Sequence, residues 1–88
     1  MPMVKIWIKL IKDDKIIKDV VVEREEQFEW ANFADYLTEG LFPLDEPTPV
    51  VIKNHILNFA KYNVARFVPS DFLEPVDFDF VWVENLDR

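Results

Sequence analysis

The strongest constraint on the fold is the alternation of side-chain types along residues 3–12, MVKIWIKLIK. Every second residue from Val4 to Leu10 is aliphatic, and two lysines and a tryptophan lie between them. Successive side chains of a β-strand point to opposite faces, so this period of two predicts a strand. Residues 16–23 are rich in β-branched side chains and predict a second strand. The short turn through Asp13 and Asp14 favours an antiparallel hairpin.

From Glu25 the apolar residues adopt the spacing of one helix face, which predicts a first helix that ends near Gly40. The residues of that face are Trp30, Phe33, Ala34, Leu37 and Leu41. Three glutamates between residues 25 and 29 suit the positive end of the helix dipole. Thr48 and Pro49 form a typical helix start, so a second helix is expected over about 49–61.

The rest of the chain supplies the remaining strands. Residues 64–68 predict either a short strand or an extended segment, residues 69–71 a turn, and residues 76–84 a last strand. We therefore expect one α+β domain over residues 1–88, in the order β-β-α-α-(β)-β. An antiparallel sheet of three to four strands would carry both helices on one face. The last strand is expected beside the first, where Lys5 and Lys9 would meet Asp77 and Asp79.

Charge and composition limit the classes of partner that the chain is expected to bind. The net charge is −7, and residues 19–88 carry five basic against fifteen acidic side chains. Such a surface repels phosphate, so neither nucleic acid nor an anionic membrane is expected as a partner. The chain has no cysteine, which excludes disulfides and thiolate metal sites. No apolar run approaches the roughly 20 residues that span a bilayer. A cytoplasmic location is expected.

Residues suited to catalysis are scarce. His55 and Ser70 are the only histidine and serine, and Gly40 is the only glycine, so no glycine-rich phosphate loop exists. The acidic pairs lack the spacing and the turn glycine of a calcium loop. We therefore predict no catalytic residue, no cofactor and no metal site.

Two alternatives stay open. His55, Arg66 and Asp71 combine a titratable ring, a guanidinium and a carboxylate, and they would form a small ligand-binding or enzymatic site if the fold brings them together. The acidity of residues 19–88 would also suit a mimic of nucleic acid, provided that the carboxylates line one surface at phosphate-like spacing.

The second face of the sheet gives the leading functional hypothesis. If both helices cover one face, the other is expected to expose an apolar patch of Trp7, Ile11, Val81 and Val83. Such a patch indicates a non-catalytic interaction domain, either a homodimer or an adaptor for another protein. The alternative is that the loop 41–48 or the C-terminal tail folds over the patch.

The chain also resembles a family of short, uncharacterised bacterial proteins. The residues that carry the resemblance are Val4–Lys12, Ile52–His55, Phe59, Tyr62-Asn63, Arg66-Phe67, Asp71-Phe72 and Val76–Asp79. These positions cover almost the whole chain, but they are patterns of aromatic and charged residues. The resemblance implies a small stand-alone bacterial domain, and it carries no activity, cofactor or catalytic residue.

Overall fold

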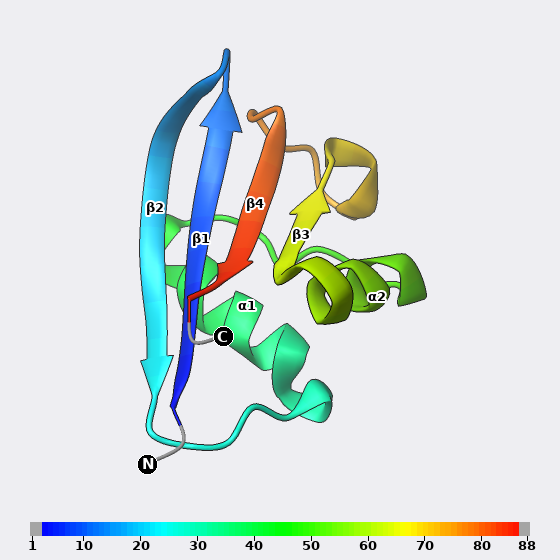
Figure 1. Ribbon diagram of the computed structural model, residues 1–88. Helices are drawn as coiled ribbons and strands as arrows, with labels where there is room; N and C mark the ends of the chain where they lie inside the picture. Colours follow the sequence, from blue (N-terminus) through cyan, green and yellow to red (C-terminus); the bar gives the residue numbers. More distant parts are fainter. Residues whose placement is uncertain (1–2, 87–88) are drawn as a thin grey trace.

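The computed structural model describes residues 3–86 as a four-stranded sheet with two α-helices and three short 3₁₀ turns (Figure 1). The strands are β1 (Val4–Lys12), β2 (Lys15–Arg24), β3 (Val64–Phe67) and β4 (Phe80–Asn85). The helices are α1 (Phe33–Leu41) and α2 (Lys53–Tyr62). The 3₁₀ turns are η1 (Trp30–Asn32), η2 (Phe42–Leu44) and η3 (Pro69–Asp71).

The sheet has the strand order β2-β1-β4-β3, and all three pairings are antiparallel. The expected α+β class and the hairpin are confirmed, as is the place of the last strand beside the first. Residues 64–67 form a true strand, which decides between the two readings of that segment.

A two-residue turn closes the hairpin. Lys12 pairs with Lys15, and the backbone φ angles of Asp13 and Asp14 between them are 53° and 63°. Positive φ at both central residues defines a type I′ turn, whose twist matches that of the strands. Aspartate tolerates this left-handed conformation better than most residues, which explains a tight hairpin in a chain with one glycine.

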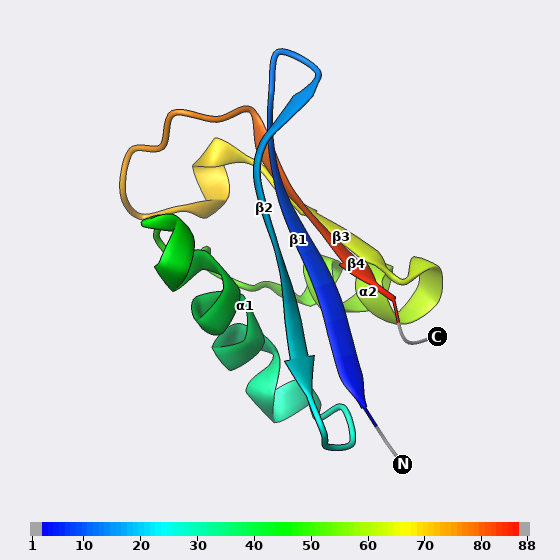
Figure 2. The same ribbon diagram turned by 90° about the vertical axis from the view of Figure 1, so that its left-hand side faces the viewer.

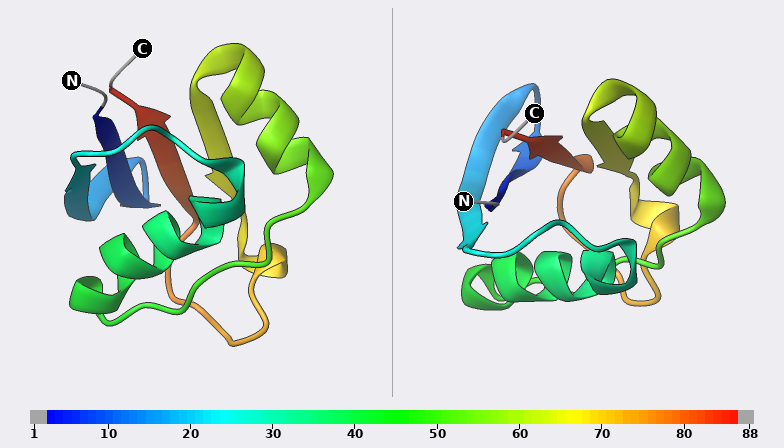
Figure 3. Two further views of the ribbon diagram at one scale, coloured as in Figure 1. Left: turned by 90° about the horizontal axis from the view of Figure 1, so that it is seen from below. Right: turned by 60° about the horizontal axis from the view of Figure 1, so that its bottom comes forward.

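One face of the sheet, the inner face, supplies most of the hydrophobic core. Its side chains are 3% or less exposed, and they come from all four strands: Val4, Ile6, Ile8, Leu10, Val22, Ala65, Phe67, Val81 and Val83. The helix α1 lies across this face under β1 and β2 (Figure 2), and α2 lies alongside β3 (Figure 3). Phe59 of α2 packs against Phe28 and Phe33, so the two helices meet in the same core.

The first helix starts later than predicted. Residues 25–29 are not helical, and α1 begins at Phe33 after the turn η1. The segment instead crosses the end of the sheet, where the Phe28 ring stacks on Phe59, 5.8 Å away. The backbone N–H of Glu29 donates to the hydroxyl of Tyr36 at 3.3 Å. Packing of Phe28 therefore overrides the local helical pattern.

The prediction that the first helix ends near Gly40 places this glycine at the helix end, but it lies inside α1, which continues to Leu41. A Cβ atom at this position would overlap Ile8 Cδ1 and lie 2.9 Å from Val22 Cγ2. The lack of a side chain therefore lets α1 approach β1 and β2 closely.

The second helix also starts later, at Lys53 instead of residue 49. The backbone N–H of Val50 donates to the carbonyl of Asp71 at 2.8 Å, and this bond ties the preceding segment to η3. Residues 49–52 are thereby held outside the helix.

The ion pairs between the first and last strands differ from the prediction. Lys9 pairs with Glu84 at 3.6 Å, and Lys12 pairs with Asp77 at 3.0 Å. Asp79 accepts a hydrogen bond from the backbone N–H of Asp13. The shift arises because β4 begins only at Phe80, which leaves both aspartates in the preceding bend.

Candidate interaction surface

The two valines of the predicted patch do not lie on the open face. Val81 pairs with Leu10 and Val83 pairs with Ile8, and both valines are fully buried on the inner face. Paired residues in an antiparallel sheet share a face, so Phe80 and Trp82 lie on the opposite side. The assignment of Val81 and Val83 to the open face was wrong, whereas Trp7 and Ile11 do lie there.

The second face of the sheet, here called the outer face, has an aromatic centre and a charged border. The central strands contribute Lys5, Trp7, Lys9 and Ile11 from β1 and Phe80, Trp82 and Glu84 from β4. The edge strands contribute Ile16, Asp19, Val21 and Glu23 from β2 and Val64 and Arg66 from β3. Sequence reasoning missed Phe80, Trp82 and the charged residues among them.

The lysine at the centre of the outer face lies among aromatic rings. Lys9 Nζ is 4.0 Å from the ring centroid of Trp7 and 5.8 Å from that of Trp82, both within the range of cation–π attraction. Glu84 pairs with the same ammonium group. The indole N–H of Trp7 donates to Asp19 Oδ2 at 3.0 Å. These contacts restrain Trp7 and Lys9 at the centre of the outer face before any partner binds.

Neither helix covers the outer face. The segment 41–48 runs on the side of α1 (Figure 2), and Lys18 holds it there by donating to the carbonyl of Leu44 at 2.9 Å. Leu86 continues the sheet, since its backbone N–H donates to the carbonyl of Lys5. Residues 87–88 of the C-terminal tail lie outside the described residues. Within residues 3–86, the loop that was expected as an alternative cover therefore lies elsewhere.

His55 has both ring nitrogens engaged. The ring is buried and lies 4.1 Å from the ring of Phe67. Its Nδ1 accepts the backbone N–H of Ile52 at 3.0 Å, and its Nε2 lies 3.3 Å from Asp71 Oδ2. The same carboxylate oxygen accepts the backbone N–H of Val68 at 2.9 Å. The pair thus fastens the start of α2 to η3, which leaves the ring no free nitrogen to act as a base.

Arg66 lies on the other side of the sheet from His55. Its neighbours in β3, Ala65 and Phe67, are buried on the inner face, whereas Arg66 is exposed. The guanidinium carbon is 5.5 Å from the ring centroid of Phe80 on the outer face. The hypothesis of one site formed by His55, Arg66 and Asp71 is therefore wrong. The structure joins only the histidine and the aspartate.

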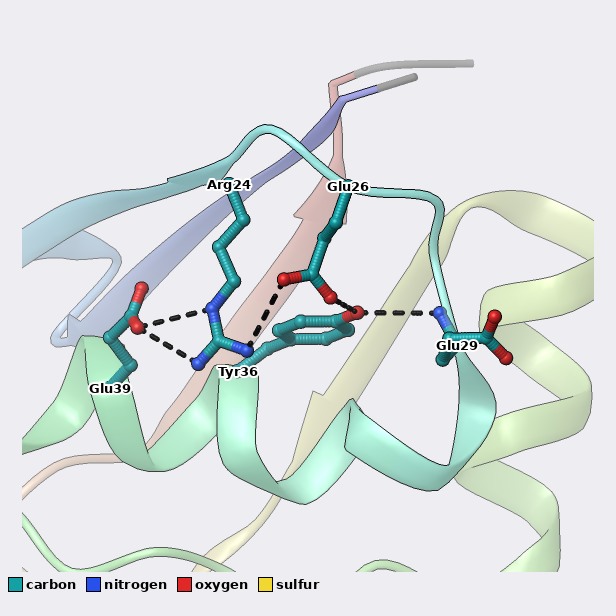
Figure 4. Close-up of polar contacts among 5 residues, drawn as sticks. All are labelled: Arg24, Glu26, Glu29, Tyr36 and Glu39. Carbon is teal, nitrogen blue, oxygen red and sulfur yellow. Dashed lines mark hydrogen bonds and ion pairs between the residues drawn. The ribbon is translucent and has the colours of Figure 1, made fainter.

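A polar network joins the end of β2 to α1 (Figure 4). Arg24 donates from Nε and Nη2 to Glu39 Oε1 at 3.1 and 2.8 Å, and the hydroxyl of Tyr36 donates to Glu26 at 3.0 Å. The hydrogen bond to Glu39 raises the pKa of Arg24. Burial raises the pKa of Tyr36, because a phenolate is poorly solvated there. The donors and acceptors within this network satisfy one another, which makes its role structural.

A hollow of about 580 Å³ opens beside η2, and Phe42, Asp45, Glu46, Pro47, Glu74 and Pro75 line it. It is open to solvent and holds no basic or nucleophilic side chain. Among residues 3–86, no cluster of three histidine, aspartate or glutamate side chains is arranged to bind a metal ion. The helices of this part of the chain are too short and too polar to span a bilayer.

Several carboxylates that gave the chain its acidic character are paired with cations. Lys12 binds Asp77, Lys18 binds Glu46, and Arg24 binds Glu39. A mimic of nucleic acid needs carboxylates that line one surface at phosphate-like spacing, and that hypothesis stays a prediction.

Comparisons with protein-family models, with curated proteins and with solved structures return no match to this chain. The resemblance to short bacterial proteins stays a prediction.

Proposed function

We propose that this chain is a non-catalytic protein-binding domain whose binding surface is the outer face of the sheet. The observation that carries the proposal is that no element of residues 3–86 covers the central aromatic strip of Trp7, Phe80 and Trp82. An aromatic centre inside a charged border is the composition typical of a protein-binding patch. We also propose, from the sequence alone, a bacterial source and a cytoplasmic location.

The restrained conformations of side chains on the outer face support binding at low entropic cost. Lys9 and Trp7 already have partners within the outer face. A partner therefore meets side chains whose rotamers are largely fixed, and little conformational freedom is lost on association. Preorganisation of this kind favours a specific complex over loose hydrophobic contact.

The charges of the outer face favour a protein over nucleic acid. Lys9 is already paired with Glu84, and the chain carries a net charge of −7. A single-stranded nucleic acid binds to stacked aromatic side chains only where a basic groove also holds its phosphates. The aromatic strip alone does not meet that requirement.

Site-specific photo-crosslinking in the source organism tests the proposal. A photoreactive amino acid replaces either Arg66 or Val21, both exposed on the outer face, or Lys53 or Asn58, both exposed on α2 as controls. We expect adducts of defined mass from the two outer-face positions and none from α2. The absence of adducts from positions 21 and 66, or equal adducts from all four, would contradict the proposal. Mass spectrometry of the adduct identifies the partner.

A further inference from the structure

The outer face is balanced in charge, although the chain as a whole is acidic. Its three cationic side chains, Lys5, Lys9 and Arg66, match three acidic ones, Asp19, Glu23 and Glu84. The net charge of −7 therefore comes from the rest of the molecule. Two copies of an acidic protein repel each other least where the local charge is zero. The outer face is such a place.

The strand registers arrange these charges in rows across the sheet, and one row has an acidic end and a basic end. One row across the four strands reads Asp19, Lys9, Trp82 and Arg66, from β2 to β3. The row is acidic at one end and basic at the other, with a cation and an aromatic ring between them. In the next row Ile11 pairs with Phe80.

We infer that the partner on the outer face is a second copy of this chain, stacked face to face about a two-fold axis parallel to the strands. The inference rests on the proposed function and names its partner. Such an axis places β2 over β3 of the second copy and β1 over its β4. Asp19 then faces Arg66 of the second copy, Lys9 faces Trp82 of the second copy, and Ile11 faces its Phe80. Each of these three contacts joins side chains that attract, and the same axis places Val21 over Val64 and Trp7 over Glu84 of the second copy.

The other face-to-face two-fold arrangement lacks this complementarity. An axis perpendicular to the strands places each strand over the same strand of the second copy. Centred on the charged row, it sets Asp19 on Asp19, Lys9 on Lys9 and Arg66 on Arg66. Centred between this row and that of Trp7, it sets Lys9 against Trp7, which attract, but Asp19 against Val21 and Arg66 against Val64. Like charges repel and charges against valine lose water without a partner, so both alternatives are disfavoured.

The twist of the sheets is compatible with the parallel axis. Face-to-face sheets cross at about 30°, which displaces edge strands about 7 Å from the axis by roughly 4 Å along the strand direction. The displacement is about one residue, and the long Arg66 side chain spans it. The central contacts of Lys9 and Ile11 lie near the axis and move less.

The size of the face predicts a weak dimer. Four strands about 4.8 Å apart and seven residues of about 3.3 Å each outline roughly 19 by 23 Å, or about 440 Å² per copy. A standard stable interface buries about 800 Å² per partner. We therefore expect a dissociation constant on the order of 10⁻⁵ to 10⁻⁴ M, and half-occupancy only at comparable protein concentration.

A charge-reversal cycle on the purified full chain tests the arrangement by sedimentation equilibrium, from about 5 μM to about 1 mM. The variants are Asp19→Lys, Arg66→Glu and the double variant. The controls Asp35→Lys and Lys53→Glu make the same charge changes at exposed helix positions. We expect wild type to pass from 10.5 kDa to twice that mass. Each outer-face single variant reverses a charge in both symmetry-related Asp19–Arg66 contacts and should weaken the dimer by at least about tenfold, and the double variant should recover most of the loss.

A wild-type mass of 10.5 kDa throughout, or a double variant as weak as the sum of its singles, overturns the inference. Circular dichroism checks each fold. If Asp19→Lys unfolds the chain by losing the hydrogen bond of Trp7, the comparison of Arg66→Glu with Lys53→Glu decides alone. If the chain is monomeric but still crosslinks to a different protein, the inference of a dimer is wrong, and the outer face remains the proposed binding surface. A monomeric chain without any crosslink removes both.

Discussion

The two faces of one sheet differ in how deeply their apolar side chains are buried and in what those side chains contact. On the inner face, aliphatic side chains such as Ile8 and Val81 are fully buried under the helices. On the outer face, Trp7 and Trp82 are only half-buried, and they contact a lysine instead of a hydrophobic layer. The inner face thus accounts for the stability of the fold, and the outer face presents a preorganised surface. Apolar content alone does not separate the two roles, whereas burial and partners do.

Truncation of an isoleucine on each face gives the largest contrast. Ile8→Ala should lower the free energy of unfolding by about 3 kcal/mol, because it leaves a cavity under α1. Ile11→Ala, on the half-buried outer face, should cost less than about 1 kcal/mol. Urea unfolding at low micromolar concentration measures both without interference from association. Equal costs would show that the two faces do not differ as described.

The residues of the discarded ligand site offer a second contrast. His55→Ala should destabilise the chain by about 2–3 kcal/mol, because it removes a buried ring that bonds the start of α2 and Asp71. Arg66→Ala, exposed on the other side of the sheet, should change stability by less than about 1 kcal/mol. Thermal unfolding followed by circular dichroism measures both. A neutral His55→Ala would reopen the possibility of a functional histidine.

A single added methyl group tests how closely α1 packs on the inner face. Gly40→Ala should destabilise by about 1–2 kcal/mol, since overpacking outweighs the gain in helix propensity of roughly 1 kcal/mol. Adding Ile8→Val removes the methyl group that the new Cβ would overlap. The double variant should therefore lose less stability than the two single changes combined. Strict additivity in urea unfolding would contradict the close approach.

The first strand and the hairpin are readable from the sequence, because only one parity of residues 3–12 is wholly aliphatic from Val4 to Leu10. The face assignment of the last strand is not. All four residues from 80 to 83 are apolar, so the pattern does not show which alternate pair faces the core. The choice is made by the bend before Phe80, where the backbone N–H of Asp79 donates to the carbonyl of Ile11 and sets the register.

The separation of His55 from Arg66 was equally hidden from the sequence. It depends on which side of a four-residue strand faces the core, and Arg66 alternates with two buried residues. Its flanking alanine and phenylalanine carry that signal. The sequence alone, however, did not establish β3 as a strand, because that depends on its pairing with β4, for example of Phe67 with Val81. The contact of His55 with Asp71 follows from η3, which returns the chain to α2.

A hydrogen-bonded tyrosine of the core, Tyr36, gives the smallest expected effect and a pH dependence. Tyr36→Phe should cost about 1 kcal/mol at neutral pH through lost hydrogen bonds to Glu26 and Glu29. Because the pKa of Tyr36 is raised in the folded chain, its contribution is fully present below the ordinary value of 10.0 and is lost as the pH rises above it. Unfolding at pH 7 and at alkaline pH should therefore show a shrinking difference between wild type and variant. A difference that grows with pH would contradict the assignment.

The most direct test of the outer face as the dimer interface uses the three tryptophans as matched probes. Trp7 and Trp82 lie on the outer face, whereas Trp30 lies among the helices, where it contacts Phe33 and Phe59 and is 43% exposed. The indole N–H signals are followed by ¹H–¹⁵N NMR as the purified chain is diluted from about 1 mM to about 20 μM, across the expected dissociation constant. We predict that the signals of Trp7 and Trp82 shift together while that of Trp30 stays fixed. Three unchanged signals, or a shift of Trp30 alone, would contradict dimerisation through the outer face.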